Sequence, residues 1–141
     1  MTWKKKGSRS TNKYGAVKVT VDGITFDSRA EEKRYGQLKI LQDAGEIVGL
    51  TCHPRFELIP GAVIDGKMER GISYTADFAY IEHGKFVVED VKGVATRDYE
   101  LRKKMMLLLR GIRVREIDAK TMEVRKCKKR KGRTKSEFWT I

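Results

Sequence analysis

The sequence predicts an α/β fold in which helices flank a mixed central β-sheet. Three observations favour this class. Short runs rich in Val, Ile, Tyr and Phe recur along the chain and are separated by turn signals. Two longer segments, 27–44 and 97–110, place apolar residues at helical spacing. A strand, a helix and a further strand follow one another in the second half, which is the order typical of a mixed α/β sheet.

Length and charge narrow the function. The 141 residues suffice for about one domain with its own core. Lys and Arg number 31 against 19 Asp and Glu, a net charge of +12, so the expected partner is a polyanion, most often nucleic acid. No apolar run is long enough to span a membrane and no signal peptide opens the chain, so we expect a cytoplasmic protein. Cys52 and Cys127 belong to no Cys/His cluster, which predicts reduced thiols and no zinc site.

The first half of the chain reads as an arm, a hairpin and a helix. Residues 1–13 are polar and basic and predict a flexible arm, before a domain over 14–120. Alternating valines, then Asp22-Gly23, then Ile24 to Phe26 predict a β-hairpin. A helix is expected from Asp27-Ser28 to about 44, with Gly45 at its end.

Glu31 lies on the apolar stripe of this helix. It precedes Tyr35 by four residues and Leu38 by seven, which aims its carboxylate inward, whereas Glu32 shares the solvent face. Ser28-Arg29-Ala30-Glu31 also fits a capping box, in which Glu31 only reaches back to the start of the helix. Periodicity leaves both interpretations open.

The middle of the chain predicts strands around one loop. Segments 47–50 and 56–59 read as strands separated by His53-Pro54, and 60–72, with three glycines, reads as a loop. Two strands, 74–81 and 85–93, then form a central ribbon with a turn at 82–84.

This ribbon carries three charged side chains close together, for which packing offers no reason. Asp90 and Lys92 share one face of their strand, and Asp77 lies on the neighbouring strand within reach. One interpretation is a solvated ion pair at a strand end. The other is a divalent cation held by the two carboxylates with the lysine beside it, which indicates phosphodiester hydrolysis.

The last third is a helix, a strand and a basic tail. The helix at 97–110 is expected to turn Leu101, Met105 and Leu108 inward, and 112–117 reads as a strand. The charged face of the helix is either solvated or follows DNA phosphates. The segment 121–141 is dense in basic residues, so we interpret it as a nucleic-acid-binding segment, a localisation tag being the alternative. The candidate phosphate-binding residues are Arg97, Arg102, Lys103, Arg125, Lys126, Lys128, Lys129, Arg130 and Lys131.

The order of these motifs resembles a known family. Asp22-Gly23-x-x-Phe26-x-Ser28-x-x-Glu31, then Tyr74-Thr75-Ala76-Asp77-Phe78, then Glu89-Asp90-Val91-Lys92-Gly93 are similar to small phage-encoded PD-(D/E)XK nucleases and to phage endonuclease I, a Holliday-junction resolvase. The similarity covers about residues 16–117. Ala76 stands where the motif often has proline, and Asp90 replaces the commoner glutamate. Strand alternation assigns Asp90 and not Glu89, unless a bulge reverses the faces.

The resemblance implies a restriction-endonuclease-like core and an active site of Glu31, Asp77, Asp90 and Lys92. By the same resemblance Asp77, Asp90 and the Val91 carbonyl hold Mg²⁺, with Mn²⁺ as a substitute, and Glu31 binds a second ion or orients water. Lys92 positions or deprotonates the attacking water and steadies charge on the phosphate.

The substrate implied is branched DNA, and the expected assembly is a homodimer, because a junction needs two symmetric nicks and one chain carries one site. The expected setting is the cytoplasm of a phage-infected bacterium. Two alternatives stay open: a nicking or end-processing nuclease, and a non-catalytic nucleic-acid-binding protein.

Overall fold

The structure is a computed structural model that describes residues 17–126, so the predicted arm at 1–13 and the tail from 127 lie outside the described residues. Its elements make a mixed α/β fold with two helices. In chain order they are β1 (Val19–Val21), β2 (Ile24–Phe26), α1 (Arg29–Asp43), β3 (Ile47–Cys52), β4 (Arg55–Ile59), β5 (Ala62–Ile64), β6 (Lys67–Glu69), β7 (Ile72–Thr75), β8 (Phe78–Glu82), β9 (Lys85–Lys92), α2 (Arg97–Arg110) and β10 (Arg115–Asp118).

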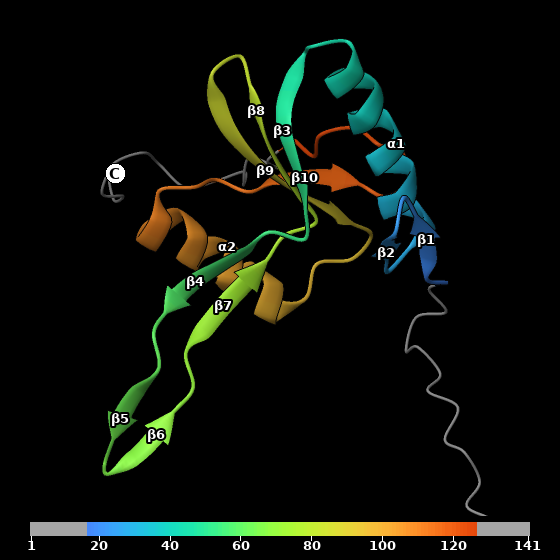
Figure 1. The fold of residues 1–141 in the computed structure, drawn as a ribbon. Helices are drawn as coiled ribbons and strands as arrows, with labels where there is room; N and C mark the ends of the chain where they lie inside the picture. The colour runs from blue at the N-terminus through green and yellow to red at the C-terminus, as the bar shows by residue number, and fades with distance from the viewer. Residues whose placement is uncertain (1–16, 127–141) are drawn as a thin grey trace, which may run out of the picture.

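The central sheet has four strands in the order β10-β9-β8-β3. β9 and β10 are parallel, whereas β8 is antiparallel to both β9 and β3, so the sheet is mixed as predicted. Figure 1 shows α1 beside one part of this sheet and α2 below it. The core accordingly has two clusters, one with residues of α1 and one with residues of α2.

Alternation along β8 and β9 divides side chains between these clusters. Phe78 and Tyr80 join Val91 in the α1 cluster, whereas Ala79 and Val88 pack in the α2 cluster. Successive side chains of a strand point to opposite faces. Glu89 therefore shares the α1 face with Val91, and Asp90 shares the α2 face with Val88.

Two-residue turns join the short strands. In the predicted hairpin, Asp22 and Gly23 have φ of 52° and 76°, the left-handed conformations of a type I′ turn. The same geometry recurs at Asp65-Gly66, with φ of 50° and 76°. The prediction of a loop at 60–72 was therefore wrong, because an Asp-Gly turn within it joins β5 to β6.

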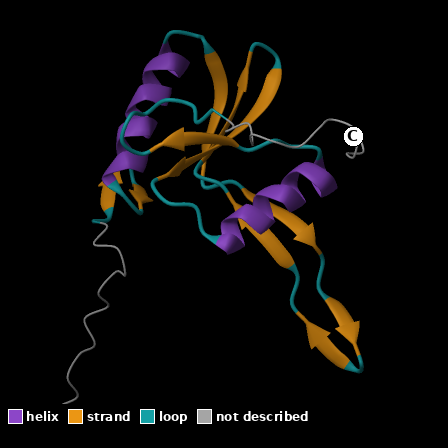
Figure 2. Cartoon of the chain, turned by 180° about the vertical axis from the view of Figure 1, so that it is seen from behind, coloured by secondary structure: helices purple, strands orange, loops and turns teal. Residues whose placement is uncertain are grey.

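Residues 55–75 form a projecting β-finger. β4 pairs with β7 at its base, where both strands contact α2, and β5 pairs with β6 at its tip. Figure 2 shows the finger leaving the body of the molecule. Gly71 lets its two strands approach, since a Cβ there would lie 2.5 Å from the Ile59 carbonyl oxygen.

The inward face predicted for α2 was wrong for two of its three residues. Met105 packs against the α2 cluster, but Leu101 and Leu108 are 57% and 63% exposed, and Tyr99 and Met106 are the buried residues. This helix carries apolar residues on nearly every face, so periodicity alone did not select one. Contact with β4 and β7 decides which face is covered. The other helix agrees with the prediction: α1 buries Tyr35 and Leu38, begins after the cap Ser28 and ends before Gly45.

Candidate functional site

Asp77 lies where the chain leaves one sheet and enters another. The predicted strand 74–81 is divided here, because Tyr74 pairs within β7 and Phe78 opens β8. Both flanks hold the Asp77 backbone: its amide donates to the Glu89 carbonyl at 3.2 Å, and its carbonyl accepts from the His53 amide at 2.9 Å. The carboxylate Oδ2 accepts a hydrogen bond of 2.8 Å from the Val91 amide. Asp77 is thus fixed against the end of β9.

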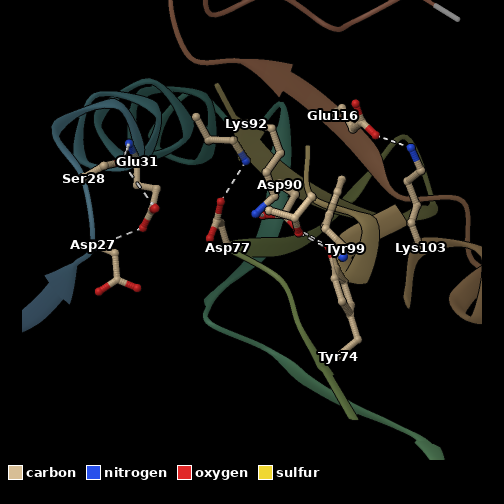
Figure 3. Close-up of polar contacts among 12 residues, drawn as sticks. Asp27, Ser28, Glu31, Tyr74, Asp77, Asp90, Lys92, Tyr99, Lys103 and Glu116 are labelled. Atoms are coloured by element: carbon tan, nitrogen blue, oxygen red, sulfur yellow. Dashed lines mark hydrogen bonds and ion pairs between the residues drawn. The ribbon is translucent and has the colours of Figure 1, made fainter. Parts of the chain in front are cut away.

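Asp90 is 1% exposed and lies next to Asp77 (Figure 3). The Tyr74 hydroxyl donates to its Oδ2. Lys92 Nζ lies 3.1 Å from its Oδ1 but outside hydrogen-bond geometry, so among the described residues Oδ1 is a buried oxygen without a hydrogen-bond donor. A carboxylate oxygen in this state has capacity for a further cation or donor.

Lys92 is held between an aromatic ring and the segment that follows β10. Its Nζ lies 4.6 Å from the centre of the Tyr99 ring, a cation–π contact. Its backbone carbonyl accepts from Arg125 Nη2 at 2.7 Å and from the Ala119 amide at 3.2 Å. Both ends of the lysine are therefore positioned beside Asp90.

The electrostatics of the pair follow from burial. Desolvation, and after it the neighbouring charge of Asp90, together raise the pKa of Asp77 to about 9. Two carboxylates this close and this dry resist being ionised together. A cation between them, or a shared proton, relieves the repulsion.

Glu31 has the contacts of a helix cap and still acts on Asp77. Its amide donates to Ser28 Oγ at 3.2 Å, and its carboxylate accepts from Ser28 Oγ at 3.3 Å and from the Asp27 amide at 3.2 Å. Burial raises the pKa of Glu31, and its charge contributes to raising that of Asp77. Capping and an orientation toward the site are therefore compatible, although no three acidic, His or Cys side chains gather into a metal-binding group within residues 17–126.

Glu89 occupies the other face of β9. It is fully buried and forms two hydrogen bonds with Arg34, of 2.7 and 3.0 Å, while Tyr80 donates a third. The β8–β9 register runs without a bulge from Phe78 to Glu82. The side chain next to Lys92 and Asp77 is consequently that of Asp90.

The donor set fits a hard divalent cation. Asp77 and Asp90 offer carboxylate oxygens, one of them without a hydrogen-bond donor, and no thiolate or imidazole joins them in the described part of the chain. Oxygen ligands in small number are what Mg²⁺ uses when it retains several waters. Val91 contributes its amide to Asp77 in this structure, and its carbonyl as a ligand stays a prediction.

The predicted phosphate-binding residues divide into engaged and free side chains. Arg102 bonds Asp98 and the Ser73 carbonyl, and Lys103 bonds Glu100 and Glu116. Arg125 holds the carbonyls of Lys92 and Gly93 and pairs with Asp118. Arg97 and Lys126 are exposed. The remaining four, Lys128, Lys129, Arg130 and Lys131, lie outside the described residues.

Sequence reasoning missed three residues that organise the site. Tyr74 binds Asp90, Tyr99 lies under Lys92, and Arg34 neutralises Glu89. Tyr74 lies in a segment that the sequence predicts to be an ordinary strand, so nothing marked it as part of the site. It belongs to a different sheet from Asp90, and only the fold brings the two side chains together. For Arg34 the sequence offered one signal: an arginine on the helix between Glu31 and Leu38 suggests a buried acidic partner.

Comparison with known proteins gives a family but no activity. A family model described as "Protein of unknown function (DUF1064)" matches residues 11–132. No curated protein and no solved structure matches the chain. Within residues 17–126, neither helix has the length and apolar character needed to cross a membrane.

Proposed function

The chain belongs to the DUF1064 family, and we propose that it is a metal-dependent endodeoxyribonuclease of the PD-(D/E)XK type with a restriction-endonuclease-like core. One observation carries the proposal: the half-buried carboxylate of Asp77 and the buried carboxylate of Asp90 meet beside the ammonium of Lys92. A pure binding protein gains nothing from desolvated carboxylates near a phosphate, since they repel it. The net charge of +12 supplies the attraction for DNA.

Each residue has a role in this mechanism. Asp77 and Asp90 hold Mg²⁺ or Mn²⁺, which when bound supplies Lewis-acid stabilisation of charge on the phosphate. Lys92 orients the attacking water and donates to the phosphate oxygen that gains charge. Glu31 orients the same water from the start of α1. Tyr74 fixes the rotamer of Asp90 through its hydroxyl.

Branched DNA is the proposed substrate, and a homodimer is the proposed form. Resolving a four-way junction takes two symmetric nicks, and a two-fold dimer presents two sites related by that symmetry. The measurement is cleavage of a junction against its component duplexes, with light scattering for mass. Equal rates from a monomer would remove the resolvase proposal and leave a nicking or end-processing nuclease.

The test of catalysis is nicking of supercoiled DNA in Mg²⁺ and in excess EDTA. Asp77→Asn, Asp90→Asn and Lys92→Ala should abolish nicking, whereas DNA affinity measured in EDTA should change by less than about threefold, because phosphate contacts come from other residues. Lys33→Ala, which removes an exposed charge from α1, is the matched control and should cut normally. Nicking that persists in EDTA contradicts the metal mechanism, and binding without nicking by the native chain supports the non-catalytic alternative.

A further inference from the structure

A basic groove lies apart from the carboxylate pair. It has a volume of about 880 Å³ and runs between the start of β9, the second half of α2, β10 and the segment after it. β9 links the two places: Lys85 at its start lines the groove, and Lys92 at its end belongs to the site. At about 3.3 Å per residue these ends lie roughly 23 Å apart.

The rim of the groove carries exposed, positively charged side chains. Lys85, Lys104, Arg113 and Lys126 line it and are exposed, and in residues 17–126 no carboxylate lies within ion-pair distance of any of the four. The single acidic lining residue, Glu116, is occupied by Lys103 and Arg125. The rim therefore suits the phosphates of a nucleic-acid strand.

The floor is apolar and aromatic. Phe86 is 54% exposed on β9, with its ring steadied edge-on by Phe56 at 6.4 Å between centroids. Leu107 and Val124 widen this surface and are 38% and 51% exposed. A duplex presents phosphates and sugars to a groove of this kind, whereas unpaired bases present faces that stack on an aromatic ring.

We infer that this groove binds a single-stranded segment of DNA, with phosphates on the rim and a base stacked on Phe86. The inference rests on the proposed function only in taking DNA as the polyanion. The groove also points toward the site: Lys103 lines it and lies 5.5 Å from the ring of Tyr99, whose other cationic neighbour is Lys92. The Lys103 side of the groove is therefore the side nearer to the carboxylate pair, and Lys85 lies on the far side.

The test measures binding in excess EDTA, so it is independent of cleavage. Fluorescence anisotropy compares a short labelled oligo(dT) with a duplex of the same length, using the full chain. Phe86→Ala should weaken oligo(dT) binding about 5- to 150-fold, the range for losing one stacked base, and should leave duplex binding within about twofold. Phe86→Tyr keeps the ring and should restore affinity. Val94→Ala, at a residue 84% exposed and outside the groove, is the matched control.

Arg113→Ala provides a second reading that does not depend on the ring. It should weaken oligo(dT) more than Lys33→Ala does, and it should lower the dependence of log affinity on log salt by about 0.7. Unchanged oligo(dT) affinity in both Phe86→Ala and Arg113→Ala overturns the inference. Equal losses for duplex and single strand assign the groove to duplex, and Phe86-dependent binding of an acidic peptide assigns it to protein; either result also overturns it. Each readout stands whether or not the native chain cuts DNA.

Discussion

Asp77→Asn should stabilise the metal-free protein, by an amount that grows with pH. Desolvation and the charge of Asp90 raise the pKa of Asp77 to about 9, far above the value of an unfolded chain. The folded state then binds a proton that the unfolded state has lost. The stability linked to this proton is fully present below about pH 4, the unfolded pKa, and is lost as pH rises toward the folded pKa. An asparagine carries no such proton, so its variant escapes that loss.

The magnitude follows from the linkage slope. One proton contributes at most about 1.4 kcal/mol per pH unit inside the window. Between about pH 6 and pH 8 the variant should therefore gain up to about 2.7 kcal/mol over the native chain, or roughly 10 °C in Tm for a domain of this size. Sharing of the proton with Asp90 reduces this figure without changing its sign.

The assay is thermal unfolding followed by circular dichroism across this pH range, in EDTA and in Mg²⁺. Asp65→Asn is the control, because Asp65 is exposed and has a positive φ that asparagine also accepts. Mg²⁺ should raise the Tm of the native chain, most at high pH, and should leave the Asp77→Asn variant unmoved. Parallel Tm curves for native chain and variant in EDTA would refute the electrostatic reasoning.

Three further predictions concern other parts of the chain. Glu89→Gln should lower unfolding free energy by about 3–5 kcal/mol, the loss for breaking a buried ion pair, while activity per folded molecule stays near native; a full loss of activity in a folded variant would contradict the assignment of faces on β9. Met106→Ala should cost about 2–5 kcal/mol in chemical denaturation and Leu108→Ala under about 0.5 kcal/mol, because only the first leaves a cavity; equal values would return Leu108 to the core. Deletion of 127–141, if these residues make about five phosphate contacts, should flatten the slope of log affinity against log salt on duplex by about 4 to 5; an unchanged slope would give the tail another role.

The sequence carried much of the fold because local signals were strong where one face of an element is buried. Alternation, Asp22-Gly23 and the cap at Ser28 each specify backbone geometry within a few residues. The signals failed where burial is decided at a distance. The helix 97–110 is apolar around most of its circumference, so its covered face depends on where β4 and β7 lie. The strands of the finger tip are three residues long and exposed throughout, so no apolar pattern marked them.

The candidate site shows the same contrast between local signals and long-range contacts. Strand alternation alone assigns Asp90 and Glu89 to opposite faces of β9, because the alternation of side chains depends only on adjacent residues. The contact between Tyr74 and Asp90 depends on the break between β7 and β8. Composition does not reveal this break, since 74–81 is uniformly rich in strand formers. At Ala76-Asp77 the chain leaves the β7 pairing before joining β8, and the backbone amides and carbonyls released there bond Pro54, His53 and Glu89 instead. The backbone at Asp77 is thus held both by the turn between β3 and β4 and by β9, and its carboxylate by the Val91 amide. These bonds limit movement of Asp77 relative to Asp90 and favour the preorganised geometry that a metal site requires.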